Sequence, residues 1–229
     1  MKNKKLFFSI IVVVFLISSI SLFAQTILTA ENYFDEVSQR YGQVKDYGAS
    51  ITITRGDTVM KGKLYYKIPN LLRIDFTDPK DQVLVSNGEE LTIYIPKYEV
   101  IMTQKLKKHS STALASMASE QGLKLLKKNY SIAYLVGPAP IPLDDKSKEM
   151  VVNLKLTSRS VSEGFRQIII SIDKDKLIRR IKGVTTGYDE ITFDFIGIKV
   201  NQNIPDSRFD YDSPPYANVY NNFLFESQE

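Results

Sequence analysis

Apolar and polar residues alternate with a period of two along most of this 229-residue chain, and short turns separate the alternating segments. The pattern begins at Ile51 and returns, segment after segment, as far as Phe195. Successive side chains of a strand point to opposite faces, so each segment has one apolar and one polar face. Turns as short as Arg55-Gly56-Asp57 and Asn87-Gly88 join antiparallel neighbours. The pattern predicts a mainly β fold of about 11 strands, in which one antiparallel sheet curves toward a barrel.

A helical period precedes the first strand. Thr29 is placed to accept hydrogen bonds from the first turn of a helix, and Gly42 is placed to end it. The apolar residues between them recur at steps of one, three and four and form one stripe: Tyr33, Phe34, Val37 and Tyr41. Because an aromatic stripe of this kind must pack on an apolar surface, we expect the helix to cover the concave side of the sheet as a lid.

A second helical segment interrupts the strands between residues 104 and 129. Ser110-Ser111 can cap a short Ala-rich helix, and Gly122 separates this helix from a group of leucines. The segment is also rich in lysine: Lys105, Lys107, Lys108, Lys124, Lys127 and Lys128. Such a cluster is either a solvated helix face or a docking patch for anionic lipid headgroups or an acidic partner.

The chain begins with three lysines, an apolar run over residues 6–23 and the small residue Ala24. This order is typical of a secretory signal peptide cleaved near Ala24, although a run of this length can also stay as a membrane anchor. Without residues 1–24 the 30 lysines and arginines fall to 27, against 26 acidic residues. A nearly neutral exported protein is not primarily a nucleic-acid binder. We expect residues 25–229 to form a single periplasmic domain, with a polar and aromatic tail from about residue 214.

The residue types that most catalytic and metal sites need are scarce. Cys is absent, which excludes disulfides, thiolate catalysis and a Cys-linked lipid anchor. A serine hydrolase triad would depend on His109, the one histidine of the chain. The carboxylate pairs Asp144-Asp145 and Asp173-x-Asp175 lie in polar contexts that are typical of turns. We therefore expect no enzymatic activity, no metal and no cofactor.

Several segments carry a family resemblance through their order and spacing. They are GKLYYKIPNLLR (residues 62–73), LVSNGEEL (84–91), YIP (94–96), FRQIIISID (165–173) and ITFDFIGIKVNQN (191–203). Together they resemble the outer-membrane lipoprotein carrier (LolA) family over residues 33–215. The resemblance implies an unclosed antiparallel β-barrel of about eleven strands with helices as a lid. It also implies a monomeric periplasmic carrier, which takes acylated lipoproteins from an inner-membrane exporter and hands them to an outer-membrane receptor.

A carrier of this kind needs an apolar surface, because a sixteen-carbon acyl chain in water costs on the order of 12 kcal/mol. The apolar positions of the predicted central strands are candidates to line such a cavity: Leu64, Tyr66, Ile68, Leu72, Ile74, Phe76, Val83, Val85, Leu91 and Ile93. The same alternation is also typical of an ordinary packed core. A carrier of another lipid or glycolipid, and an envelope sensor or interaction module, are alternatives on the same fold.

One position departs from the family pattern. The family places an Arg just before the Pro of the first motif, where it points into the barrel and holds the lid by hydrogen bonds. Here that position is Ile68. Arg73 lies beyond the turn and, by alternation, on the opposite face from Leu72 and Ile74. We therefore expect lid closure to depend on apolar contacts or on another donor.

Overall fold

The computed structural model describes residues 28–106, 119–145, 147–160 and 163–222. The predicted signal peptide, the predicted helix after Ser110-Ser111, His109, Lys107 and Lys108 lie outside the described residues.

A single antiparallel sheet dominates the fold, as the alternation predicts. Its strands are β1 (Asp46–Arg55), β2 (Thr58–Lys67), β3 (Leu71–Asp78), β4 (Lys80–Asn87), β5 (Glu90–Ile95), β6 (Val100–Lys105), β7 (Tyr130–Tyr134), β8 (Ile141–Pro142), β9 (Met150–Ser158), β10 (Phe165–Ile172), β11 (Ile178–Thr185), β12 (Glu190–Val200) and β13 (Asn218–Asn221). The order of neighbours is β13-β6-β5-β4-β3-β2-β1-β12-β11-β10-β9-β7, and β8 pairs with β9. The two ends of this order are β13 and β7, so the barrel is unclosed.

The sheet has 13 strands, against about 11 predicted. The difference comes from the shortest elements, because β8 has two residues and β13 has four. Neither is long enough to carry a run of alternation. All neighbouring strands are antiparallel except β13 and β6, which are parallel.

The first helix, α2 (Ala30–Gly42), has the predicted limits. The Thr29 side chain accepts a hydrogen bond from the backbone N–H of Asn32 at 3.1 Å, and the helix ends at Gly42. Its buried residues are Ala30 and the four of the predicted stripe, Tyr33, Phe34, Val37 and Tyr41. The aromatic stripe is therefore the packed face of α2.

The second helix, α3 (Glu120–Asn129), corrects one detail of the prediction. Gly122 does not interrupt a helix but lies in the first turn of α3, where its backbone N–H donates to the Ser119 hydroxyl at 3.1 Å. Ser119 is the N-cap, a signal that the prediction overlooked. Leu123 and Leu126 form the buried face of α3.

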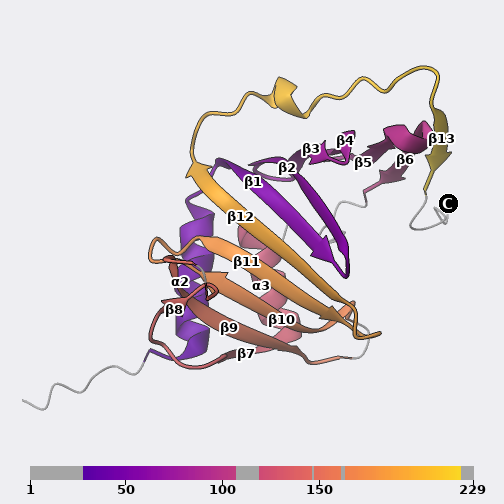
Figure 1. Cartoon of the computed structure of the whole chain (residues 1–229). Helices are drawn as coiled ribbons and strands as arrows, with labels where there is room; N and C mark the ends of the chain where they lie inside the picture. Colours follow the sequence, from indigo (N-terminus) through magenta and orange to yellow (C-terminus); the bar gives the residue numbers. More distant parts are fainter. Residues whose placement is uncertain (1–27, 107–118, 146, 161–162, 223–229) are drawn as a thin grey trace, which may run out of the picture.

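Figure 1 shows α2 and α3 side by side against one face of β7 and β9–β12, which we call the inner face. The two helices contact each other and β7. One apolar core lies on this face. It contains buried residues of both helices and of eight strands, namely β1, β2, β3, β7, β9, β10, β11 and β12. The opposite, outer face of β2–β5 carries the polar partners of the alternation, such as Lys63 and Asp75.

The C-terminal residues 201–217 form a strap that leaves β12 and runs to β13 at the far edge of the sheet (Figure 1). The strap contains the 3-10 helix η3 (Asp206–Phe209), which contacts β3 and β4 and buries Phe209. Arg73 of β3 donates to the Asp210 carbonyl at 2.8 Å, and Arg208 pairs with Asp75 at 2.8 Å. The strap thus starts earlier than the predicted tail, and it ends by adding a strand.

A close approach at Gly183 shapes the inner face of β11. A Cβ atom on Gly183 would lie 2.6 Å from two ring carbons of Phe165 on the neighbouring strand. Phe165 belongs to the apolar core and packs in the space that the missing side chain leaves. Only glycine allows this packing without a shift of the ring or of the strand.

We predict that Gly183→Ala lowers the free energy of unfolding by about 1–3 kcal/mol, because the added methyl group overlaps the Phe165 ring. Urea unfolding measures the effect. Gly137→Ala is the matched control, since nothing lies within 4 Å of its Cβ position, and it should leave the midpoint nearly unchanged. Equal midpoints for both variants would contradict the close packing of the Phe165 ring on Gly183.

Candidate functional site: the apolar interior beneath the helices

Hydrogen-bond register decides which side chains of β2–β5 share the inner face, because directly opposite residues of an antiparallel pair point the same way. One row consists of Leu64, Ile74, Leu84 and Ile93, and the next consists of Tyr66, Leu72, Ser86 and Leu91. Of the predicted lining residues, this face holds Leu64, Tyr66, Leu72, Ile74, Phe76, Leu91 and Ile93. The first five belong to the same buried core as the four lid residues.

Three predicted lining residues do not lie with this group. Val83 is opposite Asp75 and Val85 is opposite Arg73, so both valines are on the outer face. Residues 83–85 are all apolar, and alternation alone fits either face; pairing with β3 decides the register. On the inner face the place between Ile74 and Ile93 is therefore taken by Leu84, which was not among the candidates. Ile68 lies in the turn between β2 and β3 and is 48% exposed.

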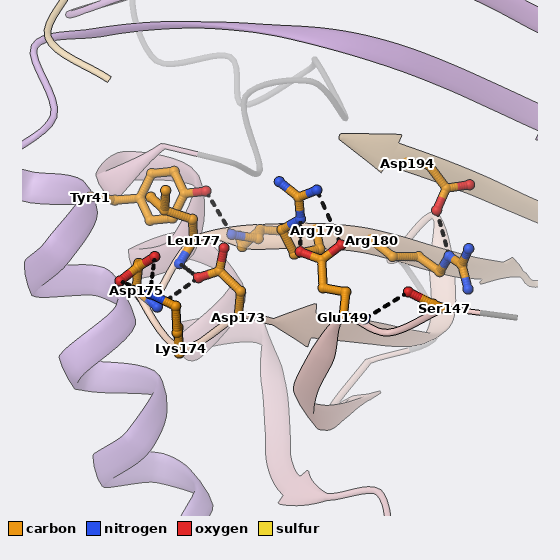
Figure 2. A network of polar contacts seen from close by, with 11 residues as sticks. Tyr41, Ser147, Glu149, Asp173, Lys174, Asp175, Leu177, Arg179, Arg180 and Asp194 are labelled. Carbon is orange, nitrogen blue, oxygen red and sulfur yellow. Dashed lines mark hydrogen bonds and ion pairs between the residues drawn. The ribbon is translucent and has the colours of Figure 1, made fainter. Parts of the chain in front are cut away.

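A buried hydrogen bond joins α2 to the sheet at the last turn of the helix. The backbone N–H of Ile178 at the start of β11 donates to the Tyr41 hydroxyl at 3.0 Å (Figure 2). Burial raises the pKa of Tyr41, so its hydroxyl is neutral across the physiological range. The sequence predicts either apolar contacts or another donor in place of the lid-holding arginine. Here a backbone N–H group is such a donor.

The strand that receives Tyr41 is itself fixed by polar contacts. Figure 2 shows Asp173 in the β10–β11 turn, where its carboxylate accepts from the backbone N–H groups of Asp175 and Leu177, each at 2.9 Å. Beside Ile178, Arg179 pairs with Glu149 at 2.5 Å, and its side chain is only 13% exposed. The turn role predicted for Asp173 is thereby confirmed.

Exposed ion pairs hold the rest of α2. Asp35 pairs with Lys127 of α3 at 2.5 Å, and Glu36 pairs with Lys176 of the β10–β11 turn at 2.7 Å. The Lys176 ammonium also lies 3.5 Å from the centroid of the Tyr33 ring. Since most of these charged side chains are about two-fifths or more exposed, each pair contributes little. Apolar burial therefore dominates the attachment of α2.

Arg73 has a different role from the lid-holding arginine of the family pattern. It lies on the outer face, opposite Val85, as alternation predicts. There it pairs with Asp75 at 2.7 Å and donates to carbonyls of the strap. Arg73 fixes the strap and does not reach α2.

Three tyrosine rings meet under the end of α2. The Tyr41 and Tyr47 rings are edge to face with centroids 6.4 Å apart, and the Tyr47 and Tyr66 centroids are 5.2 Å apart. The Tyr66 hydroxyl donates to the Pro69 carbonyl at 3.2 Å. Tyr47 is 2% exposed, and within the part of the chain that the structure describes its hydroxyl has no hydrogen-bond partner. Sequence reasoning placed none of its candidates at Tyr47.

Other candidate features are polar and lie elsewhere. A surface pocket of about 670 Å³ lies at the tips of the β1–β2 and β11–β12 hairpins, beside the Arg55–Asp189 ion pair. In the lysine cluster, Lys124 pairs with Glu120 and Lys127 with Asp35. Among the described residues, no three acidic or histidine side chains gather as metal ligands.

None of the helices in the described ranges combines the length and the apolar composition needed to cross a bilayer.

Comparisons with known proteins agree with this architecture. The model of the family described as outer membrane lipoprotein carrier protein LolA matches residues 35–212. The outer-membrane lipoprotein carrier protein of Pseudomonas paraeruginosa is 26% identical over 160 residues, which cover 69% of this chain and 70% of that protein.

Two examples illustrate the likeness of this fold to solved structures. An uncharacterized conserved protein from Thermus thermophilus gives a TM-score of 0.53 at 13% identity, covering 84% of this chain and 98% of its own. A chain in the MucA/MucB complex of Pseudomonas aeruginosa gives 0.50 at 12% identity, covering 80% of this chain and 61% of its own. At these identities the likeness concerns the fold alone.

We predict that Tyr41→Phe lowers the free energy of unfolding by about 1–3 kcal/mol, because it leaves the buried N–H of Ile178 without an acceptor. Hydrogen exchange should show faster exchange at Ile178, and urea unfolding should show the lower stability. Tyr188→Phe removes the hydroxyl of a tyrosine that is 72% exposed and should change neither measurement. Unchanged exchange at Ile178 in the Tyr41 variant would show that the contact does not hold the helix.

Proposed function

Because the chain belongs to the outer-membrane lipoprotein carrier (LolA) family, we propose that it binds the acyl chains of lipoproteins between the inner face of the sheet and α2, and carries them across the periplasm. The family match spans most of the chain, from residue 35 to residue 212. The relative from Pseudomonas paraeruginosa, named as a lipoprotein carrier, supports the same role.

The physical task of such a carrier is to replace water around hydrocarbon. At about 0.8 kcal/mol for each CH₂ group, one sixteen-carbon chain needs on the order of 12 kcal/mol of apolar contact. Leu64, Leu72, Ile74 and Phe76 offer an aliphatic and aromatic surface of this kind. Apolar contacts are non-directional, so such a surface accepts chains of different length and saturation.

The observation that carries the proposal is the way α2 is attached. Its stripe packs on the apolar core, and its polar attachments to the sheet are few among the described residues. They include the buried Tyr41 contact, an exposed ion pair at Lys176 and, at the start of the helix, the Tyr134 hydroxyl, which donates to the Thr29 and Leu28 carbonyls. Apolar contacts with an acyl chain can replace those that α2 makes. Displacement of α2 would then exchange one apolar occupant of the inner face for another, at a small difference in free energy.

The route and the partners complete the proposal. Residues 1–24 direct export and are removed near Ala24, the monomeric protein receives lipoproteins from an inner-membrane exporter, and an outer-membrane receptor accepts them. A carrier of another lipid, or an envelope sensor, would use the same displacement of α2. The lipid recovered with the protein distinguishes these cases, since a carrier of lipoproteins should return acylated protein.

A covalent tether between α2 and the sheet tests the proposal. The chain has no Cys, so Glu36→Cys with Lys176→Cys introduces the only thiols, at side chains that form an ion pair. A short bismaleimide linker between them should abolish uptake of a triacylated lipopeptide, measured as lipopeptide that stays soluble with the protein in gel filtration. The unlinked double variant should keep full uptake.

The pair Asp35→Cys with Lys127→Cys is the matched control, because it links α2 to α3 and leaves both helices free to move from the sheet together. It should reduce uptake less than the tether to the β10–β11 turn. An untethered protein that neither retains lipid from the periplasm nor solubilises the lipopeptide would contradict the proposed function.

A further inference from the structure

The Tyr47 hydroxyl is a buried polar group without an evident use in the fold. The side chain is 2% exposed, and among the described residues no donor or acceptor reaches its oxygen. Most buried polar atoms in native proteins have a hydrogen-bond partner, and an unpaired one destabilises the folded state. Phenylalanine would fill the same space without this penalty, so the hydroxyl calls for a physical reason.

The two tyrosines next to Tyr47 differ from it in their hydrogen bonding. Its ring lies between those of Tyr41 on α2 and Tyr66 on β2. The Tyr41 hydroxyl accepts from Ile178 N–H, and the Tyr66 hydroxyl donates to the Pro69 carbonyl. Of these three adjacent tyrosines, Tyr41 and Tyr66 therefore have hydroxyls bonded to the backbone, whereas the Tyr47 hydroxyl neither donates nor accepts among the described residues.

Tyr47 also lies where the inner face changes from aromatic to aliphatic. The residues of β1 that follow it on the same face are Ala49, Ile51 and Ile53. From Tyr47 to Ile53 the strand rises roughly 20 Å. A long acyl chain extended along β1 would therefore have its polar end at Tyr47 and its hydrocarbon over the isoleucines.

We propose that the Tyr47 hydroxyl is a binding site for the carbonyl group of a bound acyl chain, either an ester or an amide, and that it fixes the direction in which the chain lies. This inference rests on the proposed function, whose acyl-binding site it makes more specific. The carbonyl oxygen is the strong acceptor nearest the hydrocarbon of an acylated ligand. A neutral phenol is a suitable donor for it where water is excluded.

The position of α2 couples this site to opening. The Tyr41 ring packs edge to face on the Tyr47 ring, so displacement of the last turn of α2 would remove one of the rings that bury Tyr47. Burial raises the pKa of Tyr47 well above its usual value, which keeps the hydroxyl protonated and able to donate. The Tyr47 hydroxyl has no partner in the closed protein and gains one in the loaded protein. This difference favours the loaded state.

Tyr47→Phe tests the proposal in two measurements. In the free protein the variant should unfold at the same temperature as the wild type or higher, because no hydrogen bond is lost. Tyr41→Phe, which removes a satisfied hydroxyl from the same cluster, should unfold at a lower temperature.

The second measurement compares two soluble short-chain phospholipids that differ only in having ester-linked or ether-linked octyl chains. Each displaces a fluorescent apolar probe from the protein. The wild type should bind the ester lipid about fivefold more tightly, the effect of one net hydrogen bond, and Tyr47→Phe should bind both equally. An amide-linked analogue should behave as the ester does.

Three results would overturn the inference. Equal binding of ester and ether lipids by the wild type would remove the carbonyl site and leave the proposed carrier function intact. An ester preference that persists in Tyr47→Phe would place the site on another group. Failure of both lipids to displace the probe would overturn both this inference and the proposed function.

Discussion

The pairing of β1 with β12 is the interaction on which the rest of the structure depends. It joins a meander of strands from the first half of the chain, β1 to β6, to one from the second half, β9 to β12. Phe193 and Phe195 lie opposite Ile53 and Ile51 and continue the apolar inner face across this seam. Without the pairing of β1 with β12, the helices would cover one sheet and the predicted lining residues would lie on another.

The sequence predicts the elements well and their register poorly, for a physical reason. Alternation and a capping threonine are local signals, and they place most strands and the limits of α2. The face on which residues 83–85 point depends on pairing with β3, which no local pattern contains. The same limit hides the unpaired hydroxyl of Tyr47, since only the surrounding structure shows that a hydroxyl lacks a partner.

The two faces of the sheet use different interactions. On the inner face, burial of aliphatic and aromatic groups dominates, and one buried hydrogen bond positions α2. On the outer face, Arg73 and Asp75 of β3 form a linked set of ion pairs with Arg208 of the strap, and the Arg208 guanidinium lies 4.1 Å from the centroid of the Tyr65 ring. Ion pairs thus add to the burial of Phe209 in holding the strap, while apolar contacts dominate the attachment of the helix. Under the proposed function, this division would let α2 leave the inner face while the strap stays in place.

The parallel strand β13 has a consequence for the edge of the sheet. It lies beyond the residues that match the family model, and it pairs with β6 over residues 100–103. A sheet edge with free N–H and C=O groups is a template for aggregation with other chains. Because β13 pairs with β6 and becomes the new edge strand, the sheet ends on a strand of four residues where β6 would expose six. A shorter edge offers less backbone for such pairing.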